Sequence, residues 1–235
     1  MMYMNTKISA EDVSFLQLSD SLFPTGLYAT SSGLEALSYI KKLNPRDIRH
    51  LIAVYLQQVV GPSDCTALGN AYESSNGSDF RGLVNADESL YFMRIIEETR
   101  NASVRSGIQI LKCVSSFVKQ NEILDRYQNA IRSGDATGIY PVAFGVASWC
   151  LDIPKNKAGV MLLYGFTVSI IGAALRLGVL QHFDAQQIIH ELKPSILDSV
   201  EKNIDRPLSS MWQFAPELDI FQMKHEQMNS KMFIT

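Results

Sequence analysis

The chain has 235 residues, of which 46% are hydrophobic and 19% are charged, and its formal net charge is −3. This composition supports a sizeable core, and because it contains no run of lysine and arginine it disfavours a nucleic-acid-binding protein. The three cysteines lie far apart without CxxC spacing and no secretory leader is evident, which predicts reduced thiols in a cytoplasmic protein.

The first pronounced feature is the segment LQLSDSLFPTGLYATSSGLE at residues 16–35. Its corner is built on Phe23, Pro24 and Gly26. Proline fixes φ and removes a donor, and glycine permits positive φ, so we expect a turn of defined shape. The small residues 29–33 then predict a close-packed surface ahead of a helix that starts near residue 34.

Helix signals follow along the first half of the chain. Asn44 and Pro45 form an N-terminal cap for a helix that Gly61 and Pro62 are expected to stop. A second helix is expected from there to about residue 75, and a short one at 79–84.

Residues 87–119 predict one long helix. Leu90, Ile96, Ile108 and other apolar residues recur there every three or four positions, as one buried helical face requires. A further helix is expected at 122–132, with Gly134 as its C-cap.

In the second half, Pro141 and Pro154 each mark a helix start. A last long helix is expected from Asp184, and Pro194 is expected to bend or break it. No strand alternation is evident. The sequence therefore predicts an all-α, single-domain bundle of about eight to ten helices.

Residues 158–175 form a stretch of 18 residues without a charged side chain. This length is the lower limit for a membrane span. Three glycines, Thr167 and Ser169 lower the hydrophobicity of this stretch, so we interpret it as the buried central helix of the bundle and predict no membrane segment. Gly165 and Gly172 are expected to allow neighbouring helices to approach closely.

The search for reactive groups is negative. There is no nucleotide-binding loop, no HExxH and no GxSxG, which predicts a protein that is not an enzyme and has no cofactor or metal site. The acidic pairs at 87–88 and 97–98 diverge by about 100° on a helix, and we interpret them as solvated. His182 and His190 are eight residues apart, too far for a helical metal clip.

Five short motifs, in order, resemble the urease accessory protein UreF family. They are the opening segment 16–35; Glu98, Arg100, Ser103 and Gly107 of an E-x-R-x-x-S-x-x-x-G pattern; VAFGVA at 142–147 with LDIP at 151–154; Ala173, Ala174, Arg176 and Leu177 of an A-A-x-R-L pattern; and FAPELDIFQMKHEQ at 214–227. The chain departs from the family pattern at the corner that contains Phe23 and in the loop after Leu177.

The resemblance implies a helical, homodimeric adaptor without chemistry of its own. Such a protein would join the accessory protein UreD/UreH and recruit the GTPase UreG, so that nickel is inserted into the urease apoprotein. It also implies a helical domain at 1–206 and a partner-binding tail at 207–235. The tail is rich in apolar residues, which predicts burial on a partner or, alternatively, on the chain's own core.

The motifs also identify candidate partner-binding residues, with Arg100 and Arg176 as candidates for a contact with the GTPase. The full set is Phe23, Pro24, Gly26, Arg100, Arg176, Phe214, Pro216, Ile220, Met223, His225 and Glu226. An alternative reading is a helical ligand-binding or enzymatic domain with a pocket around Glu98, Arg100 and Tyr164. A deep pocket lined by those three residues would favour it.

Overall fold

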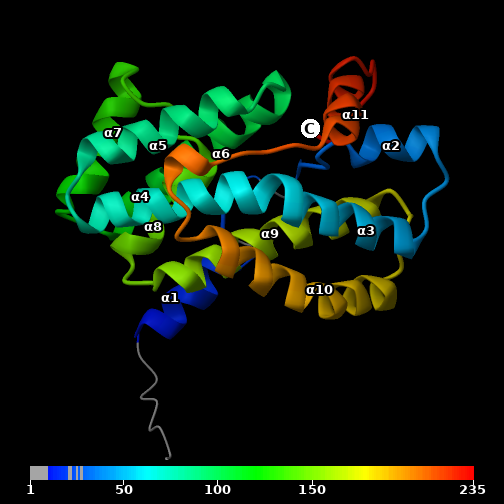
Figure 1. Cartoon of the computed structure of the whole chain (residues 1–235), viewed down its shortest axis with the longest axis horizontal. Coiled ribbons are helices and arrows are strands. Elements are labelled where there is room, and N and C mark those ends of the chain that lie inside the picture. The colour runs from blue at the N-terminus through cyan, green and yellow to red at the C-terminus, as the bar shows by residue number, and fades with distance from the viewer. Residues whose placement is uncertain (1–9, 21–22, 25, 27–28) are drawn as a thin grey trace, which may run out of the picture.

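The computed structural model describes residues 10–20, 23–24, 26 and 29–235, and this part of the chain folds into helices without a strand (Figure 1). The predicted all-α class is therefore confirmed. The elements, in order, are α1 (Ala10–Ser19), α2 (Leu34–Ile40), α3 (Pro45–Tyr55), the π-helix η2 (Leu56–Cys65), α4 (Thr66–Asn76), α5 (Phe80–Met93), α6 (Glu97–Phe117), α7 (Glu122–Ser133), α8 (Tyr140–Cys150), α9 (Lys155–Arg176), α10 (His182–Asn203), the 3-10 turn η3 (Leu208–Ser210) and α11 (Pro216–Glu226).

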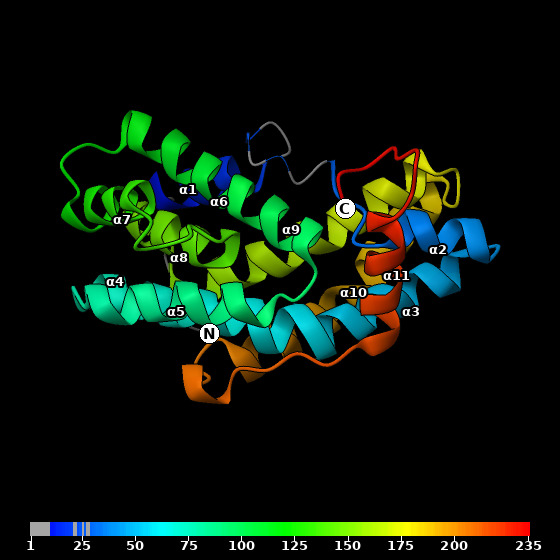
Figure 2. The ribbon, with the colours of Figure 1, turned by 90° about the horizontal axis from the view of Figure 1, so that it is seen from above.

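The bundle is elongated, and the rod formed by α3, η2 and α4 runs along it (Figure 1). At one end α8 packs between α4 and α6. Along the middle α10 lies against α9 and η2, and at the other end α11 lies on α2 (Figure 2). The C-terminal end of the chain therefore lies at the end of the bundle that contains α2, whereas α1 lies against α9 away from it (Figure 1).

Helix α9 contacts more of the other helices than any peripheral element does, including α8, α10, η2 and α3. Among the described residues it is the one helix long and apolar enough to cross a membrane, and 56% of its most apolar 18-residue window is buried inside the fold. The interpretation of this stretch as a core helix therefore agrees with its packing. One face remains open, because a Cβ at Gly165 would meet no atom within 4 Å. The expected close approach of a helix to this glycine is absent from the described structure.

The predicted stop at Gly61 and Pro62 is wrong, because the helix continues through both residues as a π-helix. A wider π turn accommodates a residue that lacks an N–H group. The carbonyl of Leu56 accepts a hydrogen bond from Ser199 Oγ at 2.8 Å. Gly61 leaves room for this contact, since a Cβ there would collide with both Ser199 Oγ and the carbonyl oxygen of Leu56.

The predicted single helix over 87–119 is also wrong, because α5 ends at Met93 and α6 begins at Glu97. Arg94 lies in the corner between them and donates two hydrogen bonds to Asp64, at 2.6 and 2.7 Å. This largely buried ion pair turns the chain away from the helical path. Ile108, expected on the buried face, is 40% exposed.

Asp87 is fully buried, so its interpretation as a solvated residue is wrong. Its carboxylate accepts a hydrogen bond from Tyr127 Oη at 2.6 Å and others from the backbone N–H groups of Thr137, Gly138 and Ile139. Asp87 thereby holds the loop that leads into α8. These donors lie 40 to 52 residues away along the chain.

The helix boundaries set by local signals agree more closely with prediction. Asn44 forms a capping box ahead of Pro45, and Gly134 closes α7 with φ of 88°. Helix α10 begins two residues before Asp184, which is the N3 residue of its capping box. It runs unbroken through Pro194, so a break at this proline is excluded.

Candidate functional site

Residues 207–235, here called the tail, lie on the body of the molecule and form most of the candidate site. After α10 the tail crosses the rod of α3, η2 and α4 as an extended strap that leads to α11 (orange in Figure 1). The N–H of Phe214 donates to the carbonyl of Gln58 at 2.9 Å, and the N–H of Trp212 donates to that of Pro62 at 3.2 Å. In an α-helix the Gln58 carbonyl would accept from residue 62, which is proline and has no N–H. The strap therefore donates to a carbonyl that has no ordinary α-helical partner.

Helix α11 begins at Pro216, so this proline starts regular structure rather than interrupting it. Proline is well suited to the first turn of a helix, where its missing N–H has no partner in any case. The tail is thus an ordered part of the described structure.

The strongest contacts of the tail form around His225, whose side chain is fully buried. Its Nε2 lies 3.0 Å from a carboxylate oxygen of Glu35 in α2, and its Nδ1 lies 2.7 Å from a carboxylate oxygen of Glu98 in α6. We call these three residues the latch. It joins three elements that are distant in the sequence. Glu98 is paired with His225 here, so its interpretation as a solvated residue is wrong.

Further tail groups converge on the same two carboxylates. The backbone N–H groups of Met232 and Phe233 donate to Glu35 at 2.8 and 3.1 Å, and Lys231 Nζ donates to Glu98 at 2.6 Å. Burial acts to raise the pKa of the Glu35 carboxyl, but the hydrogen bonds from Met232, His225 and Phe233 outweigh it and hold that pKa below its ordinary value. Glu35 is therefore an ionised anchor for the tail.

The small residues before α2 form the surface on which the tail lies, as the sequence predicted. Ser31 is fully buried, and its N–H donates to the carbonyl of Thr235 at 2.9 Å. Gly33 has φ of +80°, and a Cβ there would lie 3.0 Å from the backbone nitrogen of Gln222. Only glycine allows both this conformation and this close approach of α11.

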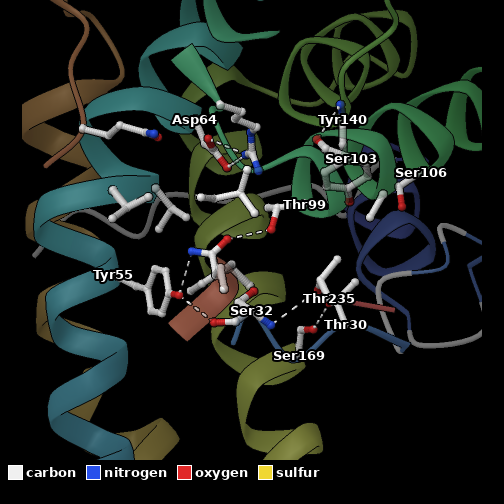
Figure 3. Close-up of a pocket in the computed structure, with 18 of the residues that line it drawn as sticks. Thr30, Ser32, Tyr55, Asp64, Thr99, Ser103, Ser106, Tyr140, Ser169 and Thr235 are labelled. Atoms are coloured by element: carbon white, nitrogen blue, oxygen red, sulfur yellow. Dashed lines mark hydrogen bonds and ion pairs between the residues drawn. The ribbon is translucent and has the colours of Figure 1, made fainter. Parts of the chain in front are cut away.

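A cavity of about 100 Å³ lies beside the latch, between η2, α6 and α9 (Figure 3). Hydroxyl groups line it, among them those of Tyr55, Thr99 and Ser169. Tyr55 Oη donates to the carbonyl of Ser32 at 2.6 Å. The tail supplies one wall, through Gln213, Asp219, Gln222 and Thr235.

Burial raises the pKa of the Asp219 carboxyl above its ordinary value. Arg94 and Asp64, which form an ion pair, also line the cavity. The interior thus combines apolar side chains with a few polar groups, and its closure depends on where the tail lies.

The candidate residues of the tail divide into two groups. Phe214 is 70% exposed, Ile220 is 50% exposed and Met223 is 42% exposed, and Pro216 is exposed as well. His225, by contrast, is buried in the latch. Glu226 is half-buried and accepts a hydrogen bond from the N–H of Glu98 at 2.7 Å, at the first turn of α6.

The predicted corner near the start of the chain lies beside α6. Phe23 is half-buried, and Pro24 and Gly26 are exposed. Gly26 has φ of +78°, as the sequence predicted. Thr25 lies outside the described residues.

The two arginines of the motifs both pack against aromatic rings of the same chain. The guanidinium of Arg100 lies 5.1 Å from the ring centroid of Tyr91 and donates to the carbonyl of Arg94 at 2.9 Å. The guanidinium of Arg176 lies 4.3 Å from the ring centroid of Phe233, in the tail. Arg100 thus supports the corner between α5 and α6, and Arg176 supports the tail.

No cavity in the described structure gathers Glu98, Arg100 and Tyr164, the residues of the alternative reading. Glu98 belongs to the latch, Arg100 stacks on Tyr91, and Tyr164 is 40% exposed on the open face of α9. The described residues also contain no group of three His, Cys, Asp or Glu side chains placed to hold a metal ion. The geometry therefore gives no support to the alternative pocket.

Sequence reasoning missed Glu35, the residue that holds the tail most extensively. It was visible only as the acid of the GLE triplet that ends the opening segment, at the start of an apolar helix. An acid at that position is ordinarily explained by the helix dipole, since carboxylates favour helix N-termini. Its real partners lie 190 to 198 residues further along the chain.

Comparison with known proteins gives a consistent result. The model of the UreF family matches residues 43–193. A urease accessory protein UreF from Trichodesmium erythraeum is 34% identical over 97% of this chain and 98% of its own length. A urease accessory protein UreF from Bacillus sp. strain TB-90 is 27% identical over 95% of this chain and 98% of its own length. The urease accessory protein UreF 1 from Brucella melitensis is 27% identical over 93% of this chain and 90% of its own length.

Proposed function

The chain belongs to the UreF family of urease accessory proteins, which are not catalysts, and from this we propose that it is a non-catalytic adaptor for urease maturation. In this role it joins the accessory protein UreD/UreH, recruits the GTPase UreG and brings both to the urease apoprotein in the cytoplasm. Nickel is the cargo of that assembly. This protein supplies surfaces that bind the other proteins and no ligands for nickel.

The observation that carries the proposal is the set of large apolar side chains that the docked tail leaves outside. Ile220 and Met223 are at least 40% exposed on α11, and Tyr39 and Ile40 of the adjacent α2 are 73% and 57% exposed. Large exposed apolar groups gathered on one face are typical of a surface that binds another protein. Methionine and aromatic residues are suited to adaptable contacts.

We propose that UreD/UreH binds this face of α2 and α11, together with the exposed Phe214 and Pro216. Changing Ile220→Asp and Met223→Asp together places two charges on the face while leaving its buried neighbours intact. Co-purification with UreD/UreH should then be lost, while the far-UV circular dichroism spectrum stays unchanged.

Leu197→Asp is the matched control, because Leu197 is 57% exposed on α10, outside the tail. It should co-purify with UreD/UreH as the wild type does. Wild-type binding by the α11 double variant, or an equal loss in Leu197→Asp, would contradict the proposed surface.

We further propose that α9 contributes to the homodimer and to the UreG-facing surface. Its open face carries Tyr164, Gly165 and Gly172, and it borders a groove that Phe23 and Arg176 also line. Close approach of a second helix here needs the absence of a side chain at Gly165. Gly165→Leu should therefore shift the mass measured by light scattering from dimer to monomer, and an unchanged mass would exclude this face.

A further inference from the structure

We propose that the docked tail is held by one proton shared within the latch, so that residues 216–235 leave the body as pH rises. This part of the tail would then act as a proton-controlled lid on the cavity. The latch lies wholly within this chain, so the device needs no partner.

The number of protons follows from the two contacts of His225. A neutral imidazole has one N–H group and one bare lone pair, whereas both ring nitrogens here lie within 3.0 Å of a carboxylate oxygen. Both contacts are hydrogen bonds only if the latch holds one proton more than a neutral ring and two carboxylates. Without that proton, a nitrogen lone pair faces a carboxylate oxygen in a buried site, which is repulsive.

The surrounding charges lead to the same count. Glu35 and Glu98 contribute two negative charges, and Lys231 contributes one positive charge. One additional proton within the latch balances the remaining negative charge. Glu226 faces the N-terminus of α6 through the N–H of Glu98, and it does not change this balance.

The nearest group from α3 is Tyr55, whose hydroxyl accepts a hydrogen bond from Gln222 Nε2 at 3.2 Å. Burial raises the pKa of this hydroxyl, so Tyr55 stays neutral as pH rises. It therefore does not titrate in place of the latch.

Release of the latch would open the cavity, because the same segment contributes a wall to it. Asp219 and Gln222 line the cavity from α11, and they lie within six residues of His225. The strap is tied separately, through backbone hydrogen bonds that carry no charge. Residues 216–235 should therefore detach as a unit at high pH while residues 207–214 stay in place.

Hydrogen–deuterium exchange of the full chain between pH 6 and 9 tests the proposal. For each peptide from 216–235, the protection factor is the intrinsic exchange rate at that pH divided by the observed exchange rate. Protection should be constant at the acidic end, where a released histidine is also protonated. It should then fall by up to tenfold per pH unit, as the loss of a single proton requires. Peptides from α8 report the stability of the core.

Three variants separate the latch from other titrating groups. His225→Gln should remove the pH dependence of tail protection. Glu98→Gln should weaken the pH dependence of tail protection, because the amide of glutamine can donate a hydrogen bond to the neutral imidazole of His225. His190→Gln is the matched control, since His190 is exposed on α10 and its ring lies beside Lys193, outside the latch, and it should behave as the wild type.

Tail protection that does not change with pH in the wild type would overturn the proposal. So would a wild-type slope in both His225→Gln and Glu98→Gln, or an equal loss of slope in His190→Gln. A fall in α8 protection parallel to that of the tail would also overturn it, because the tail would then be following global unfolding.

Discussion

Changing Gly33→Ala should weaken the docking of the tail, and its matched control is Gly134→Ala. Both glycines have positive φ, +80° at Gly33 and +88° at Gly134, so alanine carries a similar conformational cost at each. Only Gly33 faces a neighbour, since a Cβ there meets the backbone of Phe221 and Gln222. A Cβ at Gly134 meets nothing within 4 Å. The difference between the variants therefore isolates the contact with α11.

The magnitude follows from these two contributions. A left-handed alanine costs about 1–2 kcal/mol relative to glycine, and both variants should lose that amount of unfolding free energy. The added Cβ of Gly33→Ala would lie 3.0–3.1 Å from two backbone atoms of the tail, which the helix can relieve only by moving. Overpacking of this kind costs about 1–3 kcal/mol. We therefore expect a total loss of about 2–5 kcal/mol for Gly33→Ala and about 1–2 kcal/mol for Gly134→Ala.

Urea denaturation followed by circular dichroism gives the two free energies, and limited proteolysis reports the tail directly. In Gly33→Ala the bonds within 216–235 should be cleaved faster than in Gly134→Ala, at pH values where the latch is protonated. Equal free energies together with equal cleavage rates would refute the reasoning, because Gly33 would then serve only its own backbone conformation.

Asp87→Asn should lower the unfolding free energy by about 3 kcal/mol, since an amide cannot accept from all the donors around it. Glu88→Gln, at an exposed position, should change the unfolding free energy by less than about 0.5 kcal/mol. Similar values for both variants would exclude the buried network as the cause. The lowered pKa of Glu35 stabilises the fold above the ordinary glutamate range, so stability should fall as pH drops below about 4.5; Glu35→Gln should show a smaller fall, and an identical acid profile would contradict this role. Burial raises the pKa of the Cys65 thiol to about 12. Iodoacetamide at pH 8 should therefore label the half-buried Cys113 before Cys65. Labelling of both cysteines at the same rate would be inconsistent with the burial of Cys65.

The parts of the fold that the sequence predicted are those governed by neighbouring residues. Asn44 with Pro45 and Gly134 mark helix ends through contacts within one turn, and the structure places them as expected. Gly61 and Pro62 have the same local meaning, yet the helix continues there. Ser199 and the strap donate hydrogen bonds to carbonyls of the π-helix, and no local pattern reveals these contacts.

The candidate site was predicted less completely for the same reason. The exposed residues of α11 were identified through the motif and the apolar character of the tail. The latch was not, although Glu98 and His225 were both singled out, because each was assigned to a different role. Glu35 has no chemical signature of its own. Its function is defined only by the tail residues that fold onto it.

The pairing of residues 29–35 with residues 222–235 also has a consequence for the order in which the protein folds. Contacts across about 200 residues form late, because a long loop must close before they contribute. During synthesis, α2 and the segment before it emerge long before their partners in the tail. This part of the surface is therefore uncovered on the nascent chain, where a ribosome-associated chaperone has access to it until translation brings the tail.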